Sequence, residues 1–243
     1  MPKYRKRDAD SYGHAIGILM IDYRGPFIPG DVGNATTYEY PVLYKLVKGL
    51  TFDRVLARDS SFKDVVVSAA KELEAAGVRA ISSDCGFLVH YQSAVQKAVR
   101  VPVCLSSLLQ IPFLTSMFDR SRPIGCITAS RQALGSRVLE LAGIGADYHV
   151  VLGGMEDQPH FKEAMLGETG EFDSDLIEAE VVACARELKG RHPDMSAIVI
   201  ECSMLPPYAK SIQEATSLPV FDFVTMIDFC YAGTHRPAYA GYY

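Results

Sequence analysis

Two cysteines, each preceded by an acidic residue, occupy matching places in the two halves of the chain. Cys85 follows Asp84 in the stretch ISSDCGF, and Cys202 follows Glu201 in the stretch IVIECSM. In both stretches an apolar run ends at the acid and the thiol, and a helical pattern begins. At the amino end of a helix, unpaired backbone N–H groups and the helix dipole stabilise a thiolate and lower the thiol pKa. The sequence therefore predicts that each thiol acts as a base or a nucleophile.

The two stretches are copies within an internal repeat. Residues 80–103 align without a gap on residues 197–220, and nine of the 24 paired positions are identical. Two copies imply two similar lobes rather than a solenoid, which needs at least three copies. Lobes that face one another across a pseudo-twofold axis bring both thiols to one cleft. Inverting a carbon stereocentre suits such a pair, because one group removes a proton from one face and the other returns a proton to the opposite face.

Apolar runs that alternate with helical patterns predict the elements that position these thiols. Residues 14–22 are typical of a strand buried on both faces of a parallel sheet, and residues 23–41 form a long loop rich in Gly, Pro, Asn and Asp. Helices are expected at residues 61–77, 87–99, 131–143 and 173–190, and further strands at residues 78–83, 101–106, 122–130, 148–154 and 196–202. This alternation indicates parallel sheets covered on both faces.

The predicted fold class is therefore α/β, with two pseudo-symmetric lobes. Each lobe is expected to be a mostly parallel sheet flanked by helices, with the active site in the cleft between the lobes, at the carboxyl ends of the strands. We expect residues 14–112 together with residues 221–243 to form the first lobe. Residues 113–220 are expected to form the second.

The composition limits the classes of function. The chain has 243 residues, 49% of them apolar, and a formal net charge of −5, which favours a globular protein with a sizeable core. The negative charge and the lack of a sustained Lys/Arg block argue against a nucleic-acid partner or a membrane-surface partner. Without a membrane-spanning run or a secretory leader pattern, the expected location is cytoplasmic. The other four cysteines are dispersed and are expected to be reduced core residues.

Removal of a proton from carbon leaves negative charge on the substrate, and hydrogen-bond donors must stabilise that charge. The backbone N–H groups of Gly86 and Ser203 follow the two thiols and are placed to help. Neutral side-chain donors also lie at predicted strand ends or in the long loop: Asn34, Ser83, Thr128, Ser130 and Ser203. Asp84 and Glu201 leave two interpretations open, because each either tunes its cysteine or caps the next helix.

The stretches SSDCGF, VIECSMLPPY and GILMID…PGDVGNATTYEYPV resemble the aspartate/glutamate/hydantoin racemase superfamily over nearly the whole chain. The resemblance implies two pseudo-symmetric α/β lobes, no pyridoxal phosphate or metal, and a cysteine pair that takes and returns the α-proton of a carboxylate or hydantoin substrate. By motif position that pair is Cys85 and Cys202. The superfamily also includes arylmalonate decarboxylases, which use one cysteine, and maleate isomerases, which use a cysteine nucleophile.

The function predicted from these observations is a cofactor-independent racemase or epimerase, an isomerase acting on an amino acid, a hydantoin or a related carboxylate. The expected assembly is a homo-oligomer. A superfamily decarboxylase or cis–trans isomerase is the alternative enzyme. A bilobal small-molecule-binding protein without turnover is the alternative from another class.

Overall fold

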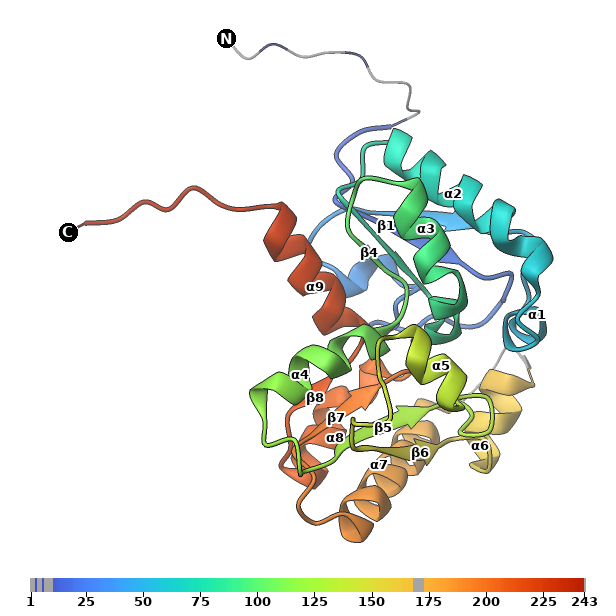
Figure 1. Ribbon diagram of the computed structural model, residues 1–243, viewed down its shortest axis with the longest axis vertical. Coiled ribbons are helices and arrows are strands. Elements are labelled where there is room, and N and C mark those ends of the chain that lie inside the picture. Colours follow the sequence, from blue (N-terminus) through green and yellow to red (C-terminus); the bar gives the residue numbers. More distant parts are fainter. Residues whose placement is uncertain (1–2, 4–5, 7–10, 168–172, 243) are drawn as a thin grey trace.

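The computed structural model describes residues 3, 6, 11–167 and 173–242, and Figure 1 shows two lobes stacked along the long axis of the molecule. Each lobe is built around a parallel sheet of four strands. Helices cover the sheets, and the two sheets have the same connectivity. The predicted α/β fold with two similar lobes is confirmed.

The first sheet has the strand order β2-β1-β3-β4. Its two central strands are almost wholly buried, because their short apolar runs are paired on both sides and covered on both faces. The edge strand β2 is half-buried and was not among the predicted strands. The strand bounds are β1 Ile16–Met20, β2 Val42–Leu46, β3 Ala80–Ser83 and β4 Val103–Cys104.

The second sheet repeats this arrangement with the order β6-β5-β7-β8. Its central strands are fully buried, as in the first lobe. The strands β3 and β7 fall at identical positions of the internal repeat, so the repeat in the sequence is also a repeat in the structure. The strand bounds are β5 Ile124–Thr128, β6 Val150–Gly154, β7 Ala197–Ile200 and β8 Val220–Phe221.

Helices connect consecutive strands in both lobes. The α-helices are α1 Phe52–Leu56, α2 Lys63–Ala75, α3 Gln92–Ala98, α4 Ile111–Met117, α5 Ser136–Leu141, α6 Pro159–Phe161, α7 Ser174–Arg191, α8 Ala209–Thr216 and α9 Phe223–Thr234. The 3₁₀ helices are Ala35–Thr37, Ser60–Phe62, Gly86–Tyr91, Ser107–Gln110 and Pro206–Tyr208, and Lys162–Leu166 is a π-helix. Within the described part of the chain, no helix is both long enough and apolar enough to cross a bilayer.

Two predicted helices differ from the observed ones. The helix expected at residues 87–99 begins as a 3₁₀ helix over Gly86–Tyr91 and becomes α-helical only at Gln92. The helix expected at residues 131–143 is shortened to Ser136–Leu141, because Gly135 precedes it in an extended conformation. The element that follows the first thiol is thus a tight 3₁₀ turn rather than a full α-helix.

Equivalent backbone hydrogen bonds in the two lobes fix the point at which each acid–thiol pair leaves its sheet. The backbone N–H of Asp84 donates to the carbonyl of Leu19 on β1, at 3.0 Å. The backbone N–H of Glu201 donates to the carbonyl of Ile127 on β5, at 2.7 Å. Each thiol therefore lies one residue beyond the last pairing of a central strand, at the carboxyl edge of its sheet, where α/β proteins bind ligands.

The chain passes between the lobes twice. It enters the second lobe after β4 and returns to the first lobe after β8, where α9 packs against the first sheet (Figure 1). The buried side chains of Phe223, Met226 and Ile227 on α9 join Ile16 and Ile18 of β1 in one apolar cluster. Another cluster of buried residues runs from the first lobe into the second, which holds the lobes together around the thiols.

Candidate active site

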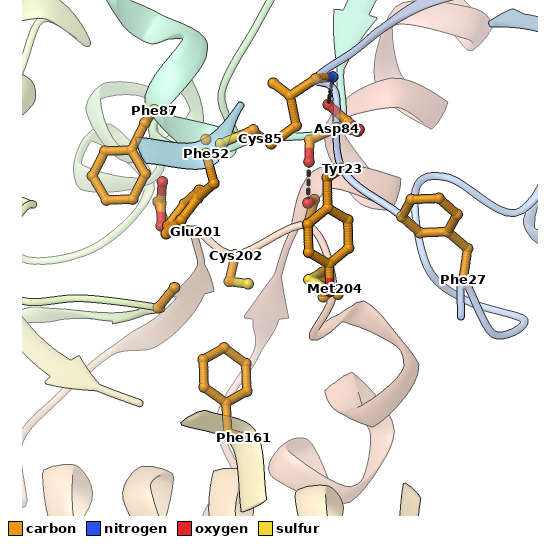
Figure 2. Close-up of a pocket in the computed structure, with 14 residues that line it drawn as sticks. Tyr23, Phe27, Phe52, Asp84, Cys85, Phe87, Phe161, Glu201, Cys202 and Met204 are labelled. Carbon is orange, nitrogen blue, oxygen red and sulfur yellow. Dashed lines mark hydrogen bonds between the residues drawn. The ribbon is translucent and has the colours of Figure 1, made fainter. Parts of the chain in front are cut away.

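The two repeat cysteines line one pocket between the lobes. Cys85 comes from the end of β3 and Cys202 from the end of β7, and each side chain is less than one tenth exposed. Figure 2 shows both thiols facing the same space, with Phe161 closing it on the side of the second lobe. The structure thus brings together the pair that the sequence repeat singles out.

Five of the fourteen described lining residues of this pocket are aromatic. The rings are Tyr23, Phe27, Phe52, Phe87 and Phe161. The loop after β1 supplies the first two, α1 the third, the turn after Cys85 the fourth and α6 the fifth. The polar groups at the wall are the two thiols, two carboxyls and the hydroxyls of Tyr23 and Ser203, and no Lys, Arg or His is among the described lining residues. The wall is therefore mostly apolar, and the ionisable groups among its described residues are acids, thiols and the Tyr23 phenol.

Both thiols are held in the neutral form, contrary to the sequence-based prediction. Burial raises the pKa of Cys85 and of Cys202 well above the ordinary thiol value, and the neighbouring carboxyl of Glu201 raises both further. The backbone N–H groups of Phe87 and Met204 act in the opposite direction, but their effect is smaller. The predicted lowering of the thiol pKa is wrong, because desolvation by burial outweighs the backbone N–H groups that follow the thiols.

The carboxyl of Glu201 lies between the lobes. Its Oε2 accepts a hydrogen bond from the hydroxyl of Thr128 at 2.7 Å, whereas its Oε1 is buried and has no hydrogen-bond partner. A Cβ atom added to Gly86 would overlap this Oε1, which places the carboxyl directly against the residue that follows Cys85. Burial raises the pKa of Glu201 to about 7, and the bond from Thr128 opposes that rise.

The equivalent acid of the first lobe points elsewhere. Oδ1 of Asp84 accepts the backbone N–H of Ile21 at 2.9 Å, so this carboxyl fixes the start of the loop after β1. The backbone carbonyl of Asp84 accepts a hydrogen bond from the hydroxyl of Ser203 in the other lobe. Burial raises the pKa of Asp84, and its bond from Ile21 acts against that rise.

A third buried acid, Asp31, was missed by the sequence analysis. It lies in the loop after β1, is 2% exposed, and accepts the backbone N–H of Gly33 at 2.7 Å. Burial raises its pKa to about 7, and its charge contributes to the raised pKa of Cys202. The sequence analysis named Asn34 of this loop as a candidate donor, but nothing in the sequence separates Asp31 from an ordinary turn aspartate.

The predicted substrate-binding residues fall into two groups. Gly86 and Ser203 line the pocket. Asn34, Ser83, Thr128 and Ser130 are not among the lining residues. Thr128 acts through Glu201, and Asn34 donates from Nδ2 to the carbonyl of Phe27 at 2.8 Å.

The other two hydroxyls have local partners. Ser83 donates to the carbonyl of Leu105 at 2.7 Å, and Ser130 accepts the backbone N–H of Ala133 at 3.3 Å. Strand-end position alone predicted these hydroxyls as ligands. Their backbone partners instead make them supports of the loops that follow β3 and β5.

No protein-family model matches the chain. Among curated proteins, a dimethylsulfoniopropionate lyase from Durusdinium sp. clade D is 33% identical over 229 residues, covering 90% of this chain and 74% of that protein. Dimethylsulfoniopropionate lyases 5 and 7 from Emiliania huxleyi (strain CCMP1516) are each 32% identical. Those two matches cover 93% and 87% of this chain, but only 46% and 64% of the relatives.

Solved structures match the fold over a similar length. A glycine-to-cysteine mutant of arylmalonate decarboxylase aligns with 94% of this chain and 97% of its own, with a TM-score of 0.60 and 16% identity. Glutamate racemase from Francisella tularensis subsp. tularensis SCHU S4 aligns with 91% of this chain and 81% of its own, with a TM-score of 0.54 and 16% identity. These likenesses confirm the resemblance to the racemase superfamily at the level of the fold.

The predicted activity is wrong. The curated relatives are lyases, which overturns the expectation of an isomerase of the amino-acid or hydantoin racemase type. Opposed thiols in a bilobal cleft predict proton transfer at carbon, but they do not distinguish inversion of a stereocentre from elimination. Which of these two reactions occurs depends on the substrate that the residues lining the pocket bind.

Proposed function

The chain belongs to the family of the dimethylsulfoniopropionate lyases, and we propose that it eliminates dimethyl sulfide from dimethylsulfoniopropionate in the pocket between its lobes. This substrate carries a carboxylate at C1 and a dimethylsulfonium cation at C3. Loss of a proton from C2 and of dimethyl sulfide from C3 leaves acrylate. Because the chain spans only about half to three quarters of its listed relatives' length, the activity of the whole relatives is carried over here as a proposal.

The observation that carries this proposal is the wall of the pocket. A dimethylsulfonium group is a cation without a hydrogen-bond donor, so it is recognised by aromatic faces and by nearby negative charge. Five aromatic rings line the pocket together with the thiols, the carboxyl of Glu201 lies at its wall, and no described lining residue is cationic. The negative charge of Glu201, which raises the pKa of both thiols, also favours a sulfonium cation.

Elimination also fits the thiols. One thiol, as thiolate, removes the proton from C2, while backbone N–H groups after the cysteines, at Gly86 and Ser203, hold the substrate carboxylate where negative charge develops. The sulfide leaves as a neutral molecule and needs no acid. One base is therefore sufficient, whereas inversion of a stereocentre requires two.

The test is direct. Purified protein is incubated with dimethylsulfoniopropionate, dimethyl sulfide is measured by headspace gas chromatography, and acrylate is measured by proton NMR. We expect the two products in equal amounts, and no product from the Cys85→Ser/Cys202→Ser double variant. Absence of both products from the folded wild-type protein would refute the proposal.

A further inference from the structure

We propose that Glu201 takes the proton of the catalytic thiol, so that a carboxylate and a neutral thiol form the resting acid–base unit of the enzyme. The inference rests on the proposed lyase function and deepens it. It makes Glu201 a positioning residue, because it acts on the substrate only through a thiol. Its basis is the placement of one carboxyl oxygen.

Glu201 precedes one thiol along the chain and lies against the residue that follows the other thiol. It immediately precedes Cys202, and its Oε1 lies against Gly86, which immediately follows Cys85. Only a residue without a Cβ leaves room for the carboxyl at that place. Figure 2 shows the carboxyl facing the pocket beside Phe52 and Phe87.

The two oxygens of this carboxyl have different environments. Oε2 is anchored by Thr128, while Oε1 is buried without a partner. A buried polar atom without a hydrogen bond costs about 1–3 kcal/mol, so such an atom calls for an explanation. Oε1 is a buried acceptor without a partner in a residue that lines the same pocket as both thiols, so it is available to receive a proton during the reaction.

The two other carboxyls that act on the thiols have backbone partners. Asp84 accepts the backbone N–H of Ile21, and Asp31, whose charge acts on Cys202, accepts the backbone N–H of Gly33 and is not a lining residue of the pocket. The described lining residues include no His or Lys. The other titratable side chains that sense the charge of Glu201 are the thiols of Cys85, Cys126 and Cys202. Burial holds Glu201 at a pKa of about 7, where the carboxyl exchanges protons readily at neutral pH.

The reaction balances with this assignment. The thiol passes its proton to Oε1 of Glu201, which leaves a thiolate and a neutral carboxyl. The thiolate takes the proton from C2, the C–H electron pair forms the C2–C3 double bond, and the C3–S pair leaves on sulfur as dimethyl sulfide. Thiol and carboxyl then hold two protons, and one returns to water after acrylate leaves, which restores the resting state.

A proton shared between two groups produces two titration steps that belong to the pair. We therefore expect the rate at which iodoacetamide alkylates the reactive thiol to rise with pH up to about 7, to level off, and to rise again at higher pH. Alkylation is followed for the Cys85 and Cys202 peptides separately by mass spectrometry. This measurement needs no substrate.

Glu201→Gln keeps the shape of the side chain and removes the acceptor. In this variant the step near pH 7 is expected to disappear, so that alkylation and kcat/KM rise about tenfold per pH unit between pH 7 and 9. The wild-type rates are expected to change less than twofold over most of that range. Asp84→Asn is the matched control from the other lobe and is expected to keep the step near 7.

Thr128→Val provides a second test that keeps Glu201 in place. Loss of its hydrogen bond disfavours the carboxylate, so the first step is expected to move to higher pH, by on the order of one unit. A single step in the wild-type profile, or a step near 7 that survives in Glu201→Gln, would overturn the inference. If the two-step alkylation is present but no dimethyl sulfide is released, the shared proton stands and the proposed lyase function fails.

Discussion

In the first lobe the carboxyl of Asp84 turns back to the backbone N–H of Ile21, whereas in the second lobe the carboxyl of Glu201 packs against Gly86 of the first lobe. The strands, the acid positions and the thiol positions of the two lobes are otherwise equivalent. Both acids line the pocket, but the carboxyl of Asp84 supports a loop, whereas Oε1 of Glu201 has no hydrogen-bond partner. The difference shows that duplication preserved the placement of the thiols while the function of their neighbours diverged.

The walls of the two lobes differ in the same way. The first lobe supplies four of the five aromatic rings, including two from its long loop after β1, and the second supplies Phe161 alone. An asymmetric wall binds a substrate in one orientation. That suits elimination, in which one carbon loses a proton and its neighbour loses a leaving group.

Replacing the thiols one at a time gives the largest expected effect. We expect Cys85→Ala and Cys202→Ala to differ sharply, because elimination needs one base. The variant that loses the base is expected to lose on the order of 10³-fold in kcat, and the other much less. Release of dimethyl sulfide from each variant measures the difference, and equal losses in both would contradict the single-base mechanism.

The pH dependence of the free energy of unfolding allows the buried acids of the two lobes to be compared. Asp31 and Glu201 each have a folded-state pKa of about 7, above the unfolded value, so between about pH 4 and 7 the folded state binds more protons than the unfolded state. The free energy of unfolding must then fall as the pH rises through this window. The loss is on the order of 3 kcal/mol for each group and is complete above the folded pKa.

Urea denaturation at pH 5 and pH 8 tests whether the free energy of unfolding falls as the pH rises. Both Asp31→Asn and Glu201→Gln are expected to make the free energy of unfolding less dependent on pH than in the wild type. A variant whose stability follows the same pH dependence as the wild type would show that its carboxyl titrates normally in the folded protein.

The residues after the thiols give the next comparison. Gly86→Ala places a Cβ on the Glu201 carboxyl, and such overpacking costs about 1–3 kcal/mol. The equivalent Ser203 already has a side chain, and Ser203→Ala removes only its bond to the Asp84 carbonyl, at a cost of about 1 kcal/mol. Thermal unfolding of both variants shows which of them loses more stability. The loss of stability from Gly86→Ala should be smaller in a Glu201→Ala background.

The smallest expected effect concerns the rings. Phe161→Leu and Phe52→Leu each remove one aromatic face from opposite lobes, and KM for dimethylsulfoniopropionate is expected to rise about 2- to 10-fold, as for a cation–π contact. The inhibition constant of 4-methylpentanoate, which has the same shape without the positive charge, is the control and should change less. Equal changes for both ligands would assign the rings to packing alone.

The sequence predicted the fold well where the repeat and the apolar runs coincide. The strands β3 and β7 fall at matching repeat positions, and Cys85 and Cys202 reach one pocket. The strand β2 was missed, because its half-buried residues Val42–Leu46 lack the continuous apolar run of the central strands. Local pattern is a weaker signal for an edge strand.

The properties of the site were predicted less well, because they depend on contacts between distant segments. The pKa of Cys85 depends on burial and on Glu201, which lies more than a hundred positions away in the sequence. The different directions of Asp84 and Glu201 follow from Ile21, Thr128 and Gly86, which no local motif connects. The pattern identified the groups that react, but packing decides their charge.

The return of α9 to the first lobe sets an order of events during protein synthesis. All strands of the second sheet lie between residues 124 and 221, so that lobe is complete once Phe221 has left the ribosome. The first sheet is made earlier, yet Ile16 and Ile18 stay uncovered until α9 has followed at residues 223–234. The nascent chain thus exposes this apolar face of the first sheet until late in its translation, and a chaperone that binds emerging apolar strands would meet it there.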